Sequence, residues 1–344
     1  MKTSISTITG AALKSFAFFA AALTIASCVH EYPDDGKGID PTRISLTVEL
    51  TTNPKINASS VFSKSANTAP YVWFVVEIYE EDFGGKPVLR HEASAPKNED
   101  GSASIVLNTS LNAGKYRLAA FATCVEDEQG NGSHYDMTDL GGIVFANEEY
   151  TGSTDLKECY DLRMDIDLPN DEWLGEKTLS GILEPPVGRV EIIAEDAKEF
   201  LTKQAELLSK SGIETEEEQM WEGYKARWDY ALYFPTKYNA FTGVPTDAQT
   251  GIMFLSEMTP LSENEVLMGY DYVFVNGDKT RVNITLSLVD KETGEILNSY
   301  SGLTAEINKG ETSVIRGDFL TTSNKSGIGI DTGFEDEINI QLPD

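Results

Sequence analysis

The sequence predicts a mostly β protein, built as two tandem antiparallel β-sandwich domains with a short helical insertion in the second. Three observations support this fold class. Apolar residues alternate with polar ones over short segments, which is the period of strands buried on one face. Turn residues such as glycine and asparagine separate these segments, as in antiparallel sheets. One region instead shows the apolar spacing of a helix.

The chain opens with the features of a secretory signal peptide. Lys2 and Lys14 precede Phe16–Ile25, a run of ten uncharged residues. This run is about half of the ~20 residues needed to span a hydrocarbon core, so a permanent membrane helix is not expected. A basic flank, a short apolar core and then small residues predict that residues 1–27 are a cleavable signal peptide.

Cys28 follows this segment directly. The four residues Ile25–Cys28 resemble a bacterial lipobox, which implies cleavage before Cys28 and lipid attachment to its thiol. The alternative is a soluble secreted protein in which Cys28 is incidental. Residues 28–42 are acidic and contain glycine and proline, with too few apolar groups to fold. We therefore expect them to form a lipidated acidic tether.

The net charge limits the partners. Removal of residues 1–27 takes away two lysines and no acidic residue, so a net charge of −29 becomes −31. A body this acidic repels phosphate backbones, and nucleic acid is not an expected partner. It also repels an anionic bilayer, so membrane attachment has to come from acyl chains on Cys28.

Residues 43–180 are predicted to form the N-terminal β-sandwich and residues 181–344 the C-terminal one. A cluster of glycine and proline at Glu176–Gly188 favours a boundary there. The segments with strand alternation are Ile44–Leu50, Val72–Ile78, Leu162–Leu168, Val282–Leu288 and Glu337–Leu342.

A helical period interrupts this pattern from about residue 196 to about residue 228. Asp196 and Glu199 fit a capping box at its start. Trp221, Tyr224 and Trp228 have the spacing of one helix face. We interpret this face as packing on the second sandwich, and the alternative is an aromatic platform for a sugar ring.

Motifs of catalysis are scarce. No complete catalytic or phosphate-binding motif occurs, so no enzyme activity, catalytic residue, metal or cofactor is expected. The many carboxylates leave a secreted hydrolase as a third interpretation. Asp127–Gly132 begins like a calcium loop, but Gln129 and Thr138 replace expected ligands. A tight surface turn is the favoured interpretation of that stretch.

Cys124 and Cys159 lie in the predicted exported body, where disulfides persist. Each lies at a strand-like segment, and neighbouring strands would bring two cysteines within the reach of a bridge. Two isolated buried thiols are an equally good interpretation.

Several segments resemble the fimbrillin-like lipoproteins of Bacteroidetes, of fimbrial subunit or anchor type. In the second domain these are Tyr233–Pro235, Tyr238–Gly243, Gly269–Asn276, Arg316–Thr321 and Gly327–Asp331, and in the first domain Ala113–Tyr116 and Leu118–Ala122. With the lipobox, the resemblance covers nearly the whole mature chain.

The resemblance implies two transthyretin-like sandwiches and a lipid-anchored, non-enzymatic subunit or anchor of a fimbria-like adhesive assembly at the outer membrane and cell surface. It also implies strand exchange with other fimbrial subunits after a trypsin-like cut, for which Arg43 is the candidate site. Ile338, Ile340 and Leu342 mark a candidate donor strand. The alternative function is a surface lipoprotein that binds host or bacterial glycans or proteins, with Trp73, Trp173 or Trp221 stacking on sugars.

Overall fold

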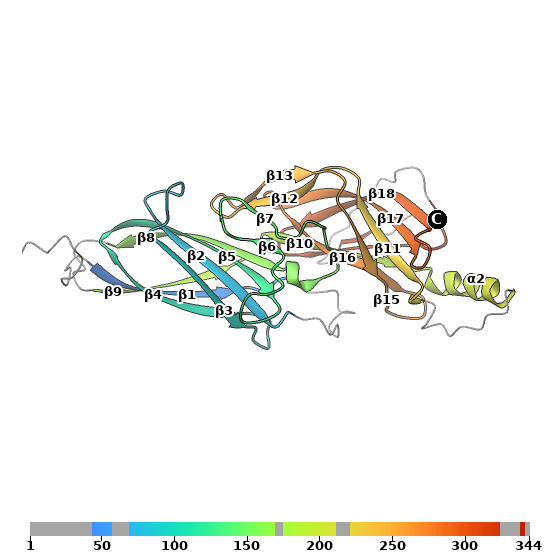
Figure 1. Ribbon diagram of the computed structural model, residues 1–344, viewed down its shortest axis with the longest axis horizontal. Helices are drawn as coiled ribbons and strands as arrows, with labels where there is room; N and C mark the ends of the chain where they lie inside the picture. Colours follow the sequence, from blue (N-terminus) through green and yellow to red (C-terminus); the bar gives the residue numbers. More distant parts are fainter. Residues whose placement is uncertain (1–42, 57–68, 169–174, 211–220, 324–337, 341–344) are drawn as a thin grey trace, which may run out of the picture.

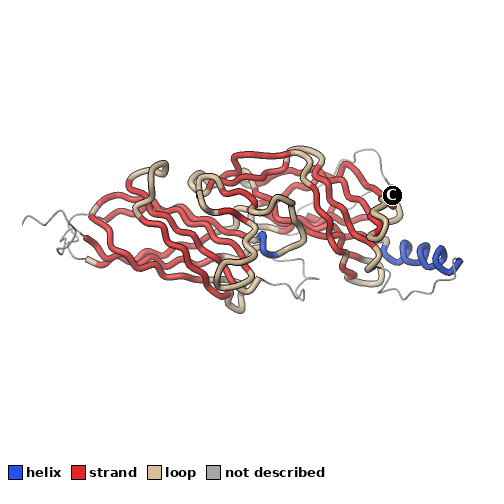
Figure 2. Tube along the Cα trace, in the orientation of Figure 1, coloured by secondary structure: helices blue, strands red, loops and turns tan. Residues whose placement is uncertain are grey.

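The computed structural model describes residues 43–56, 69–168, 175–210, 221–323 and 338–340. Within these residues the chain is mostly β, and two sandwiches lie end to end to give an elongated body (Figure 1). Figure 2 shows that strands dominate both halves and that the longest helix projects from one end. The predicted fold class, two β-sandwiches with a short helix in the second, is confirmed.

The first sandwich packs a three-stranded sheet, β4-β1-β9, on a four-stranded sheet, β3-β2-β5-β8. Its strands are β1 (Arg43–Thr52), β2 (Tyr71–Glu80), β3 (Leu89–Pro96), β4 (Ser104–Asn112), β5 (Gly114–Val125), β8 (Cys159–Leu168) and β9 (Glu176–Leu183). Pairing is antiparallel except between β1 and β9, which run parallel. The apolar residues of β1 alternate inward and meet the inner face of β2, including Phe74.

The second sandwich packs the sheet β15-β16-β10-β19-β20 on the sheet β14-β11-β17-β18. Its strands are β10 (Val187–Ala194), β11 (Tyr224–Tyr230), β14 (Met253–Glu257), β15 (Thr259–Pro260), β16 (Val266–Phe274), β17 (Lys279–Asp290), β18 (Ile296–Asn308), β19 (Thr312–Gly317) and β20 (Ile338–Ile340). Trp228 is fully buried in its core, and its indole Nε1 donates to the carbonyl of Met268 at 3.0 Å.

A fifth sheet joins the two halves. Its strand order is β13-β12-β7-β6. Strands β6 (Tyr135–Asp136) and β7 (Ile143–Phe145) lie between β5 and β8 of the first half, and β12 (Phe234–Asn239) and β13 (Val244–Gln249) come from the second half. Lys237 and Tyr238 of β12 pair with β7. A separate apolar cluster lies beneath this sheet and includes Phe121 and Phe274 from the outer faces of the two sandwiches. The halves are therefore fixed to each other by backbone pairing as well as by packing.

The helical insertion is shorter than the sequence indicates. The helix α2 spans Ala197–Lys210, and residues 211–220 lie outside the described part of the chain. Tyr224 and Trp228 belong to strand β11, so the prediction of a helix to residue 228 is wrong. In β11 these two side chains are set by the two-residue period of a strand, and burial of Trp228 in the sandwich overrides the apparent helical spacing.

The predicted capping box also does not form. The carboxylate of Asp196 accepts hydrogen bonds from the backbone amides of Leu320 and Thr321, at 3.1 and 2.6 Å, and from the Thr321 hydroxyl at 2.7 Å. Asp196 therefore holds the turn after β19 against the start of α2. The long-range contact is invisible to a search for local helix-capping signals.

Candidate functional site

The first strand of the described chain, β1, is buried on one face and paired along both edges. Ile44, Leu46, Val48 and Leu50 are each at most 1% exposed, and β1 is hydrogen-bonded to β4 on one side and β9 on the other. Removal of such a strand would leave a groove with four aliphatic pockets and unpaired backbone groups along both walls. A groove of this kind can bind an added strand.

Arg43, the candidate cleavage residue, is the first residue of β1 and is exposed. Its side chain donates to Ser110 of β4, from Nε to the hydroxyl at 3.2 Å and from a guanidinium nitrogen to the carbonyl oxygen at 2.6 Å. A cut after Arg43 would leave Ile44 and the remainder of β1 in the sheet. Cys28, the candidate lipid attachment site, lies outside the described residues.

The candidate donor strand is paired within its own chain. Ile338–Ile340 forms β20, which runs parallel to β19 with Ile338 opposite Ser313 and Ile340 opposite Ile315. β20 is the last strand of its sheet, so one of its edges has no strand partner among the described residues. Leu342 lies outside the described part of the chain.

Cys124 and Cys159 are both buried and carry free thiols. Cys159 lies opposite Thr123 in the pairing of β8 with β5, so Cys124 points to the other face of the sheet. Cys124 joins the core of the first sandwich, and Cys159 joins the cluster between the halves. Because the sheet separates them, the two residues act as isolated buried thiols, and burial raises the pKa of each.

The aromatic residues proposed for sugar stacking are placed differently from the sequence-based expectation. Trp221 is 7% exposed and stacks on Phe200, so it is not available as a surface platform. Trp73 is half-buried against the cluster between the halves. Trp173 lies outside the described residues.

The stretch that begins like a calcium loop is a tight surface turn. The Asp127 carboxylate accepts from the backbone amides of Gln129 and Asn131, at 2.9 and 3.2 Å, and from the Asn131 side-chain amide at 2.8 Å. Hydrogen bonds from Asn131 lower the pKa of Asp127. The carboxylate is therefore occupied by its own loop.

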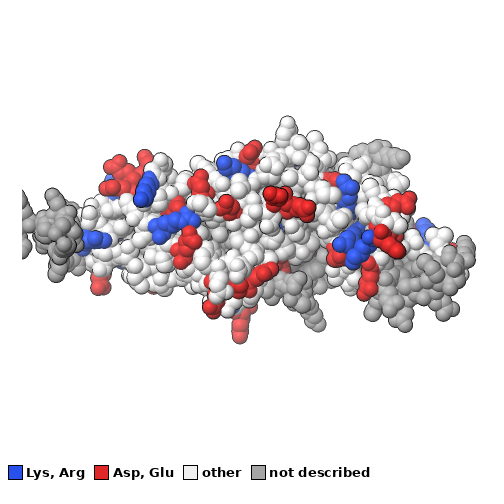
Figure 3. Space-filling model, viewed as in Figure 1, with Lys and Arg blue, Asp and Glu red and all other residues white. Residues whose placement is uncertain are grey.

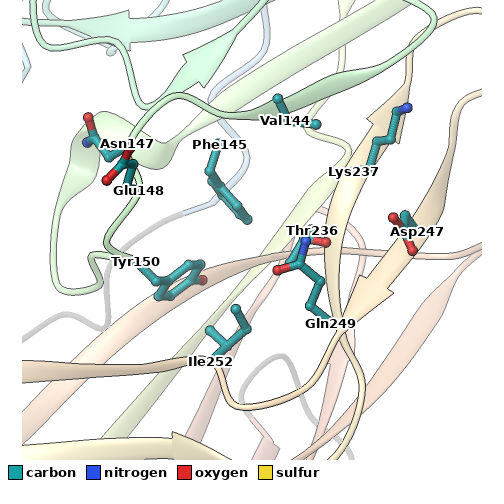
Figure 4. Close-up of a pocket in the computed structure, with 10 residues that line it drawn as sticks. All are labelled: Val144, Phe145, Asn147, Glu148, Tyr150, Thr236, Lys237, Asp247, Gln249 and Ile252. Carbon is teal, nitrogen blue, oxygen red and sulfur yellow. The ribbon is translucent and has the colours of Figure 1, made fainter.

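A pocket of about 270 Å³ opens beside the sheet that joins the halves (Figure 4). Phe145, Tyr150 and Ile252 supply its apolar surface. Its polar groups come from both halves of the molecule: Asn147, Glu148, Thr236, Lys237, Asp247 and Gln249. The sequence gives no signal for this pocket, because its two sides lie about ninety residues apart and meet only through the pairing of β7 with β12.

Buried charges cross between the halves at the same junction. Arg189 of β10 is 3% exposed and donates to Asp155 at 3.0 Å, to Glu191 at 2.7 Å and to the Tyr272 hydroxyl at 3.0 Å. Asp155 is the first residue of the single-turn helix η1 (Asp155–Lys157), which lies between β7 and β8 in the first half. Burial by itself lowers the pKa of Arg189, but its anionic and phenolic neighbours raise it overall.

Strand β16 has an irregular backbone next to these buried charges. A bulge interrupts its pairing with β10 between Leu267 and Gly269, and the φ of Gly269 is +126°. A Cβ atom at this position would lie 2.6 Å from the Ser256 hydroxyl, so a larger residue does not fit. Two residues further on, Asp271 lies fully buried, and its carboxylate accepts from the hydroxyls of Tyr150 and Tyr230 at 2.6 and 2.7 Å.

The chain is therefore a β protein of two sandwiches. Its first described strand is paired on both edges, its last is paired on one edge, and buried polar contacts join the two halves. The chain belongs to a family of unknown function, DUF6562, whose model matches residues 41–343. Comparison with curated proteins gives no significant match.

Solved structures show a distant likeness. The fimbrial anchor protein Mfa2 from Porphyromonas gingivalis is 13% identical, with 75% of this chain and 81% of that chain covered and a TM-score of 0.42. A fimbrial assembly protein from Parabacteroides distasonis is 10% identical, with coverages of 80% and 91% and a TM-score of 0.37. A candidate cell adhesion protein from Bacteroides eggerthii is 12% identical, with coverages of 90% and 100% and a TM-score of 0.44.

Proposed function

We propose that this protein is a non-enzymatic, lipid-anchored surface protein that serves as a subunit or anchor of a fimbria-like adhesive assembly. The observation that carries the proposal is β20, a chain-end strand that adds to the edge of a sheet by backbone pairing. The same pairing made with a neighbouring molecule is strand addition between subunits. The complementary feature is the position of β1: if β1 leaves its sheet, it leaves a groove with four aliphatic pockets that a strand from a neighbour can fill.

The proposed location is the outer membrane at the cell surface, with acyl chains on Cys28 as the anchor and residues 28–42 as the tether. No helix in the described part of the chain is long and apolar enough to cross a membrane. On the face in Figure 3, basic side chains are scattered among acidic ones and form no broad patch. We propose other fimbrial subunits as partners, and no nucleic acid. We place the domain division between Leu183, which ends β9, and Val187, which begins β10.

The anchor is tested with Cys28→Ala. This variant should lose incorporation of labelled fatty acid and should be released from membranes, because the thiol is the proposed acylation site. A Cys28→Ala protein that still incorporates the label would overturn the lipoprotein assignment. Cys159→Ala is the matched control and should keep both label and membrane association, since Cys159 is buried in the junction.

Assembly is tested by limited trypsin treatment followed by a native gel. A cut after Arg43 separates the tether from the body and frees the N-terminal end of β1, so that a strand from a neighbouring molecule can displace β1 from its sheet. We expect treated protein to form a ladder of polymers and Arg43→Gln to delay that ladder. Monomers alone, over a range of protein concentrations and with Arg43 cleaved, would contradict the proposed route to assembly.

A second candidate function, binding of a surface glycan, is favoured by the pocket at the junction (Figure 4). Its combination of two aromatic rings with amide and carboxylate groups suits a saccharide, which presents apolar faces and hydroxyls. Retarded migration in polysaccharide-containing gels would support this function. Gln249→Ala should then restore normal migration, and Gln129→Ala, in a surface turn away from the pocket, should not.

A further inference from the structure

A lysine and an aspartate from different halves of the molecule meet in its interior. Lys157 ends η1, which lies at the junction in Figure 2, and Asp271 belongs to β16 of the second sandwich. Their side chains are 1% and 0% exposed. The Lys157 amine donates directly to Asp271 Oδ1, although the two residues are 114 positions apart in sequence.

Aromatic rings surround this pair of charges, and Lys157 Nζ also donates to the Tyr150 hydroxyl. Lys157 Nζ lies 4.0 Å from the ring centre of Tyr150 and 5.1 Å from that of Phe145. Removal of both ions from water is costly, and their mutual attraction offsets that cost only in part. Burial lowers the pKa of Lys157 and so favours the neutral amine, although the nearby Asp271 carboxylate acts in the opposite direction. Transfer of one proton along the hydrogen bond would convert the ion pair to an amine and a carboxylic acid.

The Asp271 carboxyl group is also held in a fixed orientation. Tyr150 and Tyr230 donate their hydroxyls to Oδ2, and the backbone amide of Tyr272 donates to Oδ1 at 2.8 Å. Two donors at Oδ2 withdraw electron density from the carboxyl carbon. They also lie where negative charge would develop if a nucleophile added to that carbon. The amine of Lys157 is the nucleophile next to it.

We propose that Lys157 and Asp271 condense to form an intramolecular isopeptide bond. The ammonium group first passes a proton to the carboxylate, which leaves a free electron pair on Nζ. Nζ then bonds to the Asp271 carboxyl carbon, and the tyrosine hydroxyls stabilise the oxyanion on Oδ2. The C–Oδ1 bond breaks, and Oδ1 leaves as water with the transferred proton and a second proton from Nζ. One amide and one water molecule replace one ammonium and one carboxylate, and no oxidant or reductant is needed.

The bond would tie η1 of the first half to β16 of the second. It would remove two buried charges and replace noncovalent contacts at the junction with a covalent link. A covalent link between the halves would prevent them from separating under a force applied along the elongated body. This inference does not depend on the proposed assembly or on the lipid anchor, because it rests on contacts within one chain.

The test is peptide mapping of the full-length protein, purified from its native envelope, denatured and digested with trypsin. We expect a branched peptide in which the segment containing Lys157 is joined to the segment containing Asp271, with a mass lower than their sum by one water molecule. Fragmentation should locate the link at these two residues. Recovery of both segments only as separate, unmodified peptides would overturn the proposal, and this measurement requires no variant that has to fold.

Two variants sharpen the test. Lys157→Met keeps the length of the side chain and removes the amine, so the branched peptide should disappear. Lys97→Met is the matched control, because Lys97 forms another largely buried ion pair, with Glu158 at 3.1 Å, and its loss should leave the branched peptide in place. A branched peptide that persists in Lys157→Met would show that another lysine forms the link.

Discussion

The core of the first sandwich and the junction between the halves are both closed to solvent, but they contain different side chains. The core is lined chiefly by aliphatic residues from both of its sheets, including the inward-facing side chains of β1 and β2. The junction places Arg189, Asp271 and Lys157 among aromatic rings, and hydrogen bonds from Lys157 to Asp271 and from Arg189 to Asp155 join one half to the other. Aliphatic packing tolerates small shifts, whereas a buried ion pair requires one geometry. The difference indicates that the sandwiches provide stability and that the junction fixes their relative orientation.

The largest expected loss of stability comes from a change in the apolar core of a sandwich. Trp228→Ala removes a fully buried indole and its hydrogen bond to Met268. We expect the free energy of unfolding to fall by about 3–5 kcal/mol, as for other large-to-small core changes. Scanning calorimetry should still show one transition if the junction couples the two halves. Two separated transitions would show that the halves unfold independently.

The junction is tested by Arg189→Met. Loss of the guanidinium leaves the carboxylates of Asp155 and Glu191 without their cationic partner, and we expect a loss of about 3 kcal/mol in denaturant unfolding. The double variant Arg189→Met with Glu191→Met removes a charge of each sign and should recover part of that loss. A double variant less stable than either single change would mean that packing, and not charge pairing, dominates at this position.

A histidine beside the junction gives a smaller effect that depends on pH. Burial lowers the pKa of His134 from its usual 6.5 to about 4. The unfolded chain therefore binds a proton that the folded chain does not. The resulting stability is present above pH 6.5 and is lost as the pH falls from 6.5 to about 4. Allowing for partial exposure of the ring, we expect a loss of ~1 kcal/mol.

His134→Gln is the control for this pH dependence. Glutamine does not titrate, so the variant should show a shallower fall in stability over the same interval. Equal slopes for the parent and the variant would mean that other groups account for the acid sensitivity.

The fold could be predicted from the sequence largely because period-two alternation in segments such as Ile44–Leu50 reports a strand directly. The helix was overextended because Trp221, Tyr224 and Trp228 match a helical spacing by chance, and only sandwich packing assigns the last two to β11. The site was harder to predict. Charged residues such as Asp161 and Arg189 lie in strands, where a charged side chain suggests exposure to solvent, yet both are buried where the two halves meet. Contacts between residues over one hundred positions apart leave no local pattern.

The strand β20 should contribute least to stability and most to assembly. It pairs through three residues at one edge of its sheet, far fewer than the central strands. Ile340→Pro removes a backbone N–H and restricts the chain at that edge, so it weakens strand pairing without adding a charge. Because a single hydrogen bond contributes about 1 kcal/mol, the monomer should melt within a few degrees of the parent.

If β20 acts as a donor to a neighbour, the polymer ladder after trypsin treatment should disappear. Thr322→Pro, beyond the end of β19, is the matched control and should still assemble. A parent-like ladder from Ile340→Pro would show that this strand serves its own sheet alone and would remove strand exchange at this end of the chain.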